Sequence, residues 1–151
     1  MTVWIDADSC PVILRTFLEE RAKKSGFALS LVANREIKKR EEHKHIKMIV
    51  CSKEKGAADD FLVENAKEND IVVTRDIPLA ARLLEKNICT LNDRGTIFDK
   101  DSIEDRLKMR EFSMNLSALG FSGSEKSFYG KKELDSFKQS FEFALSRRIF
   151  L

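Results

Sequence analysis

Aspartates occur at three separate places in this chain, and their carboxylates are the side chains best suited to metal binding or catalysis. They are Asp6 and Asp8 after a short apolar run, Asp59 and Asp60 near the start of a predicted helix, and Asp76 after a later apolar run. Carboxylates that are brought together repel one another unless a cation compensates their charge. Mg²⁺ is typically held by a few carboxylate oxygens, together with water and substrate phosphates. The pattern therefore predicts a site for a hard divalent cation, suited to phosphoryl chemistry, if the fold gathers these residues.

The elements around these aspartates predict how they are gathered. Short apolar strands are predicted at 3–5, 27–33, 46–51, 71–74 and 88–91, and helices at 11–25, 57–67 and 78–86. Short apolar strands that alternate with helices are typical of an α/β protein with a mostly parallel sheet covered on both faces. In such sheets, ligands bind beyond the carboxyl ends of the strands. Asp6 and Asp76 each stand at the end of a predicted strand, so we expect them at one edge of the sheet.

The C-terminal third of the chain is predicted to be helical. Two candidate helices span about 102–118 and 131–149, and a loop with glycine and serine separates them. We expect both helices to pack on the sheet, with 100–151 forming a C-terminal helical extension. A length of 151 residues fits a single domain over 1–151, since single domains commonly run to ~100–200 residues.

Basic residues could supply the second half of a site for a polyanion. Arg35, Arg75 and Arg94 each follow a predicted strand or flank a motif, and the planar guanidinium suits phosphate because it makes paired hydrogen bonds. The segment 35–47 carries six basic and three acidic residues, and we interpret it mainly as a solvated loop. A net charge of +2 argues against a large nucleic-acid footprint and is compatible with a short single-stranded substrate.

Each aspartate also has a purely structural explanation. Aspartate is a favoured N-cap, which could account for Asp6, Asp8 and Asp76. Asp59 and Asp60 near a helix start gain from the helix dipole whatever their function. Convergence of residues from all three segments on one edge would distinguish a site from separate caps.

The composition and the N-terminus argue against several classes of protein. No apolar run approaches the ~20 residues of a membrane span, and the first residues lack the basic and long apolar regions of a signal peptide. The three cysteines are widely spaced and form no CxxC pair, so a thiolate zinc site is not predicted. We therefore expect a cytoplasmic protein with no membrane partner. The sequence predicts no particular oligomeric state.

Several short motifs resemble those of the YaiI/YqxD family of uncharacterised bacterial proteins. They are IDADSCP at 5–11, LVANR at 31–35, GAADD at 56–60 and VTRDIPLAA at 73–81, with looser matches DRG at 93–95 and LKMR at 107–110. The resemblance spans roughly 3–149. The chain departs from it at 120–125, where GFSGSE stands in place of an expected glycine–proline element.

That family looks similar to the PIN-like nucleases, in which clustered acidic residues bind Mg²⁺ or Mn²⁺ and cleave RNA. The resemblance implies a PIN-like, Rossmann-like fold of three layers. It also implies that Asp6 and Asp76 match two acidic positions, and that Asp59 or Asp60 matches a third. Asp8 is a feature of the narrower family.

The leading interpretation is a divalent-metal-dependent nuclease that acts on RNA, most simply single-stranded RNA. Asp6, Asp76 and either Asp59 or Asp60 would hold Mg²⁺ or Mn²⁺, and Asp8 would hold it or position water. The proposed phosphate-binding residues are Arg35, Arg75 and Arg94. Two alternatives stay open: a non-catalytic module that binds metal and nucleic acid, and a hydrolase of small phosphate compounds.

Overall fold

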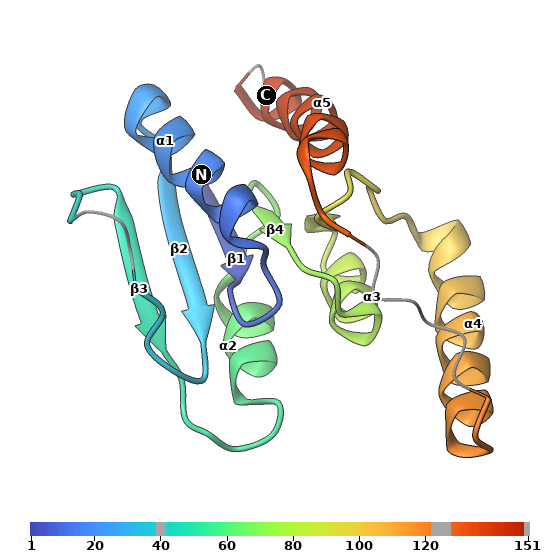
Figure 1. Cartoon of the computed structure of the whole chain (residues 1–151). Helices are drawn as coiled ribbons and strands as arrows, with labels where there is room; N and C mark the ends of the chain where they lie inside the picture. The colour runs from blue at the N-terminus through green and yellow to red at the C-terminus, as the bar shows by residue number, and fades with distance from the viewer. Residues whose placement is uncertain (39–41, 122–127, 150–151) are drawn as a thin grey trace.

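The computed structural model describes residues 1–38, 42–121 and 128–149. Within these residues, five parallel strands form one sheet in the order β3-β2-β1-β4-β5. The strands are β1 (Thr2–Asp6), β2 (Ala28–Ala33), β3 (Ile46–Val50), β4 (Ile71–Val73) and β5 (Cys89–Leu91). The helices are α1 (Val12–Ser25), α2 (Ala57–Asn65), α3 (Ile77–Glu85), α4 (Lys100–Ala118) and α5 (Lys131–Ile149). The predicted α/β class with a parallel sheet and covering helices is confirmed (Figure 1).

The strand order creates a crevice at the carboxyl end of β1. The chain runs from β1 outward through β2 to β3, and then crosses to β4 on the other side of β1. Ile5 of β1 is paired with Leu31 of β2 and with Val73 of β4. The chain leaves β1 for α1 on one face and leaves β4 for α3 on the other face. Such a topological switch point is where ligands bind in open parallel sheets.

Apolar strand residues alternate between the two faces of the sheet. Ile5 and Leu31 lie in the core beneath α1 and α5, whereas Val32 and Val72 lie in the core beneath α2 and α3. Because both faces are covered, the strands are apolar nearly throughout instead of alternating with polar residues. This explains why the strands were recognisable as short apolar runs.

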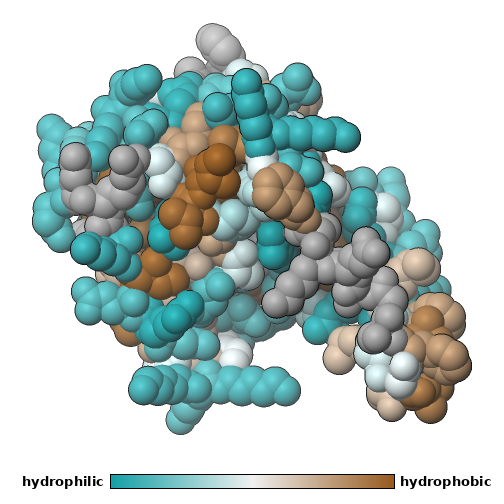
Figure 2. All heavy atoms as spheres, in the orientation of Figure 1, coloured by the Kyte–Doolittle hydropathy of each residue, from teal (hydrophilic) through white to brown (hydrophobic). Residues whose placement is uncertain are grey.

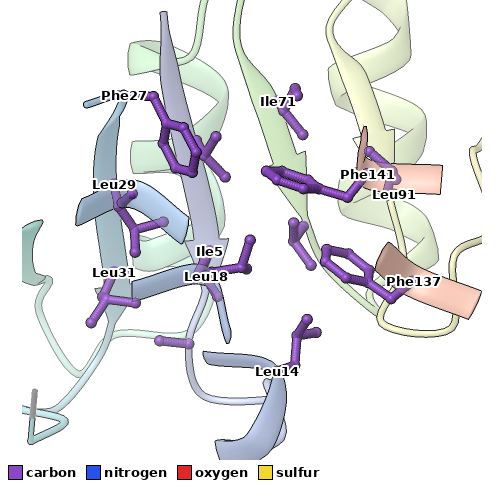
Figure 3. Packing of buried hydrophobic residues seen from close by; sticks show 14 of the residues in the cluster. Ile5, Leu14, Leu18, Phe27, Leu29, Leu31, Ile71, Leu91, Phe137 and Phe141 are labelled. Carbon is purple, nitrogen blue, oxygen red and sulfur yellow. The ribbon is translucent and has the colours of Figure 1, made fainter. Parts of the chain in front are cut away.

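The last helix, α5, forms part of the main core. Phe137 and Phe141 are both 0% exposed, and their stacked rings have centroids 5.6 Å apart. Phe17 of α1 meets both rings edge to face. Figure 3 shows Phe141 lying close to Ile71 and Leu91 of the sheet. The C-terminal helix therefore closes one face of the sheet, as we expected for this segment.

Helix α4 packs mainly on α3, which differs from our expectation that both C-terminal helices lie on the sheet. Its buried residue Ile103 joins Ala80 and Leu84 of α3 and the preceding Phe98. The second half of α4 is almost entirely exposed, and Figure 2 shows apolar side chains gathered at that end of the helix. The reason is that α3 already covers this part of the sheet, so α4 forms an outer layer beside it.

A glycine in the loop after β5 allows that loop to sit directly against α5. Gly95 has a φ of +87°, and a Cβ there would lie 2.5 Å from the backbone oxygen of Ser136. Ser140 Oγ donates a hydrogen bond to the Gly95 carbonyl at 2.6 Å, and Tyr129 Oη donates to the Asp93 carbonyl at 2.7 Å. Only glycine combines this backbone conformation with so close an approach. The loop that carries Asp93 is thereby held by the C-terminal segment.

Two segments singled out in the sequence lie partly outside the described residues. The structure describes no helix in residues 35–38 and 42–45, in agreement with a loop, and positions 39–41 are not described. The altered segment at 120–125 is described only at 120 and 121. Among the helices that the structure describes, none has the length and apolar character needed to cross a membrane.

Candidate active site at the carboxyl ends of β1 and β4

Four of the predicted aspartates line one open depression at the crevice beside β1. Asp6 ends β1 and Asp8 follows it, while Asp59 lies in the first turn of α2 and Asp76 caps α3. The depression has a volume of about 430 Å³, and its other lining residues are Ser9, Asn34, Gly56, Ala58, Arg75 and Arg110. Residues from three separate segments thus meet at the edge where strand topology placed them.

Thr74, at the end of β4, organises the centre of this site. Its hydroxyl Oγ1 donates a hydrogen bond to Oδ2 of Asp6 at 2.8 Å. The same oxygen accepts a hydrogen bond from the backbone N–H of Asp76 at 3.0 Å. Thr74 is buried, so its two hydrogen bonds fix the position of the Asp6 side chain relative to the backbone of Asp76.

Asp6 is the most buried carboxylate of the site, with 9% of the residue exposed. Burial raises the pKa of Asp6 from 3.8 to about 6, and the negative charges of Asp59, Asp76 and Asp8 act in the same direction. The hydrogen bond from Thr74 lowers the pKa and offsets part of this rise. Asp6 thus carries a charge that the protein alone compensates poorly.

Asp59 is the second aspartate with a raised pKa. Partial burial is the largest cause, followed by the negative charge of Asp76, and Arg82 opposes the shift. In the part of the chain that the structure describes, the Asp59 carboxylate has no hydrogen bond or ion pair. Asp6 and Asp59 therefore lie close to like charge, and within the described residues neither forms an ion pair with a basic side chain.

Asp76 combines the structural role of a cap with its place in the depression. Its Oδ1 accepts a hydrogen bond from the backbone N–H of Leu79 at 3.0 Å, at the start of α3. Its other oxygen, Oδ2, makes no hydrogen bond within the described residues. The capping explanation is thus correct for Asp76, and it leaves one oxygen of the carboxylate at the site.

Asp8 is tied to the end of β2. Its Oδ2 accepts a hydrogen bond from the backbone N–H of Asn34 at 3.1 Å, and its Oδ1 lies 3.5 Å from Nε of Arg35.

Asn34 also lines the depression, and its buried side-chain oxygen Oδ1 has no hydrogen-bond partner within the described residues. A buried acceptor without a donor is uncommon in folded proteins. Asn34 was missed as a site residue, although it lies in the LVANR motif.

Asp60 lies outside the depression. Its carboxylate forms an ion pair with Arg82 of α3 at 2.8 Å and is exposed. Consecutive residues of a helix point about 100° apart, and of these two aspartates it is Asp59 that lines the depression. Which of the two holds a metal ion stays a prediction, and the geometry favours Asp59.

The arginines are arranged differently from the expectation that three of them face the site. Arg75 lines the depression and is paired with the buried Asp93. Arg35 is paired with Asp8 on the surface. Arg94 points to Glu133, at 3.8 Å, and does not line the depression.

A fourth arginine, Arg110 of α4, was not predicted as a site residue. It lines the depression, and within the described residues it has no hydrogen bond or ion pair. The only signal in the sequence was its place in the LKMR motif. Its position depends on the packing of α4 against α3, which no local pattern reveals.

The raised pKa of Asp6 leads to a prediction about stability. A carboxyl group with a higher pKa in the folded state destabilises the fold when it is ionised, above pH 6. The penalty is about 3 kcal/mol at pH 7, and it disappears as the pH falls from about 6 to about 4. Asp6→Asn should therefore raise the free energy of unfolding at pH 7 by up to that amount and change it little at pH 4. Urea unfolding in EDTA at both pH values measures the difference.

Asp60→Asn is the matched control for this measurement, because Asp60 is exposed and paired outside the site. Its free energy of unfolding should stay within about 0.5 kcal/mol of the wild type. An Asp6→Asn protein that is no more stable than the wild type at pH 7 would show that the fold compensates the negative charge of Asp6, contrary to this prediction.

Comparison with known proteins identifies the family. Residues 4–147 match the model of the family described as uncharacterized BCR, YaiI/YqxD family. The chain belongs to the YaiI/YqxD family. A UPF0178 protein of Treponema denticola is 37% identical over 149 residues, covering 99% of this chain and 94% of the relative. A UPF0178 protein of Pseudomonas putida is 38% identical over 149 residues, covering 99% and 96%. No solved structure matches the chain significantly.

The family assignment confirms the resemblance seen in the motifs, while the likeness to PIN-like nucleases stays a prediction. Neither the YaiI/YqxD description nor the names of these relatives state an activity. In the described parts of the chain, no group of three or more His, Cys, Asp or Glu side chains is arranged to hold one metal ion. The function must therefore be argued from the chemistry of the depression.

Proposed function

We propose that this YaiI/YqxD protein hydrolyses phosphodiester bonds of single-stranded RNA with the help of a divalent cation, Mg²⁺ or Mn²⁺. One observation supports this proposal above all: Asp6, Asp59 and Asp76 converge on one depression, and the pKa values of Asp6 and Asp59 are raised there. A nearby dication favours the ionised form of each carboxylate and so removes the mutual repulsion.

The donor set suits a hard cation. Carboxylate and amide oxygens are the ligands that Mg²⁺ and Mn²⁺ prefer, and the buried Oδ1 of Asn34 adds a neutral oxygen without a partner. The side chains do not surround a single point, so water must complete the shell, and Mg²⁺ usually keeps several waters. A bound ion supplies a Lewis acid for the phosphate and lowers the pKa of an attacking water.

The chain's own residues have distinct tasks in this proposal. Asp6 and Asp76, linked through Thr74, provide anionic oxygens in a fixed relation. Arg75 and Arg110 line the same depression, so a phosphate that enters it meets a guanidinium group. Arg75 is held by Asp93, which fixes its direction and lowers the cost of ordering it on binding.

Incubation of a labelled short single-stranded RNA with the purified protein tests the proposal, with Mg²⁺ or Mn²⁺ compared against EDTA. We expect cleavage that requires the cation. Metal-dependent binding without turnover would instead indicate a non-catalytic module. Turnover of small phosphate esters without any binding of RNA would indicate the small-molecule hydrolase.

A rise in melting temperature with added Mg²⁺ reports the binding of the ion itself, because a ligand that binds only the folded state stabilises it.

A further inference from the structure

A second depression, of about 430 Å³, adjoins the aspartate site between the start of α3 and the 102–113 part of α4. Arg110 lines both depressions. Ile77, which lines the second one, directly follows Asp76 in the chain. Figure 1 shows α4 beside α3, and the residues that line the second depression belong to these two helices. A molecule that fills both would therefore pass Arg110.

The chemistry of the second depression differs from that of the first. Ile77 and Met109 provide apolar surface, and Ser102 and Ser113 provide hydroxyl groups. The guanidinium of Arg106 lies over the ring of Phe98, 5.6 Å from its centroid. Apolar surface with a few placed polar groups is typical of sites for small molecules. Methionine sulfur makes favourable contacts with aromatic rings.

We infer that the second depression is a nucleobase subsite, which takes the base of the nucleotide adjoining the phosphate at the aspartates. This inference rests on the proposed function and specifies its substrate. Single-stranded nucleic acid is bound where a basic path for the backbone runs beside surfaces on which bases stack. Arg110 provides the charge at the junction, and Ile77 and Met109 provide an apolar surface against which the ring of a base can pack.

Charge favours a nucleotide over an apolar peptide as the occupant. Two arginines, Arg106 and Arg110, line the depression against a single carboxylate, Asp105. Arg110 has no protein partner among the described residues, so it is available to a phosphate. Asp105 can accept a hydrogen bond from the exocyclic amino group of a base, as carboxylates do in base recognition. The depression therefore offers contacts to the ring of a base, to its exocyclic amino group and to the adjoining phosphate.

Met109→Ser is the informative variant, because it removes apolar surface without changing charge. Met109 is 64% exposed, so the substitution should not disturb the fold, and Met114 on the same helix is 55% exposed and lies outside the depression. Met114→Ser is therefore the matched control. Fluorescence anisotropy measures the affinity for a labelled single-stranded RNA hexamer with Mg²⁺, in an Asp76→Asn background that suppresses cleavage.

We expect Met109→Ser to weaken binding of the hexamer about fivefold, which lies within the range of a contact between methionine and an aromatic ring. Met114→Ser should change the affinity less than about twofold. On a hexamer whose bases are replaced by abasic sites, Met109→Ser and Met114→Ser should bind equally. Arg110→Gln should weaken binding of both hexamers, because it acts on the backbone phosphate.

Equal affinities of Met109→Ser and Met114→Ser for the base-containing hexamer would overturn the subsite. If RNA is cleaved by the wild type but neither Kd nor KM changes in Met109→Ser, the subsite is wrong and the proposed function stands. If the wild type cleaves no RNA but Met109→Ser still weakens its binding of the hexamer, the subsite stands and the nuclease proposal fails. Absence of any binding of the hexamer by the wild type overturns both.

Discussion

Replacement of Asp76 by asparagine is expected to slow metal-dependent RNA hydrolysis at least about a hundredfold, while RNA binding stays intact or becomes stronger. Loss of even an indirect contact to a metal typically costs 10–100-fold in affinity or activity, so loss of a direct carboxylate ligand should cost at least as much. Asparagine retains an oxygen that can accept the hydrogen bond from Leu79 N–H, so α3 keeps its cap. The substitution removes one negative charge from the site at which we propose that the RNA binds. Initial cleavage rates and anisotropy measurements on the same RNA report the two effects separately.

Asp60→Asn is the control for this experiment as well. Asp60 carries the same charge at the start of α2 and is paired with Arg82 outside the depression. Its cleavage rate should stay within about twofold of the wild type. A folded Asp76→Asn protein that cleaves RNA at the wild-type rate would exclude the aspartate depression as the source of the activity and would point to a contaminating nuclease.

Replacement of Phe141 by alanine is expected to lower the free energy of unfolding by about 3–5 kcal/mol. Such a loss is typical when a large aromatic side chain is removed from a fully packed core, because both burial and packing contacts are lost. Phe141 is 0% exposed and contacts Phe17, Phe27 and Phe137. Urea unfolding measures the change, and an unchanged m-value shows that the same surface is exposed on unfolding.

Phe143→Ala provides the comparison on the same helix. Phe143 is 55% exposed, and its ring lies 5.6 Å from the guanidinium carbon of Arg147. An exposed contact of this kind contributes about 0.5–1 kcal/mol. A Phe141→Ala protein that loses no more stability than Phe143→Ala would mean that α5 is a dispensable extension and not a layer of the core.

The sequence by itself determined the order of the strands and helices along the chain and the general place of the site. Strands buried on both faces appear as short apolar runs, and this signal is local. Asp6 and Asp76 stand at strand ends, and the carboxyl ends of parallel strands meet at one edge. Their proximity therefore followed from the fold class without knowledge of individual contacts. The motifs IDADSCP and VTRDIPLAA, which include these strand ends, carried the resemblance to the family.

Only the tertiary structure decided which neighbouring charges belong to the site. Asp59 and Asp60 have nearly the same local sequence. Which of them faces the depression depends on the rotation of α2 about its axis against the sheet. The partners of Arg75 and Arg94 are Asp93 and Glu133, which are distant along the chain, so composition could not show that these charges were already paired.

The same limit applies to the two C-terminal helices. Both segments were predicted to be helical from their local sequence. In the structure α5 packs into the main core, whereas α4 packs beside α3 and places Arg110 in the aspartate depression. Helix formation follows from local pattern, whereas the layer in which a helix packs depends on which apolar surface the rest of the chain has left uncovered. That surface exists only once the sheet and its other helices have assembled.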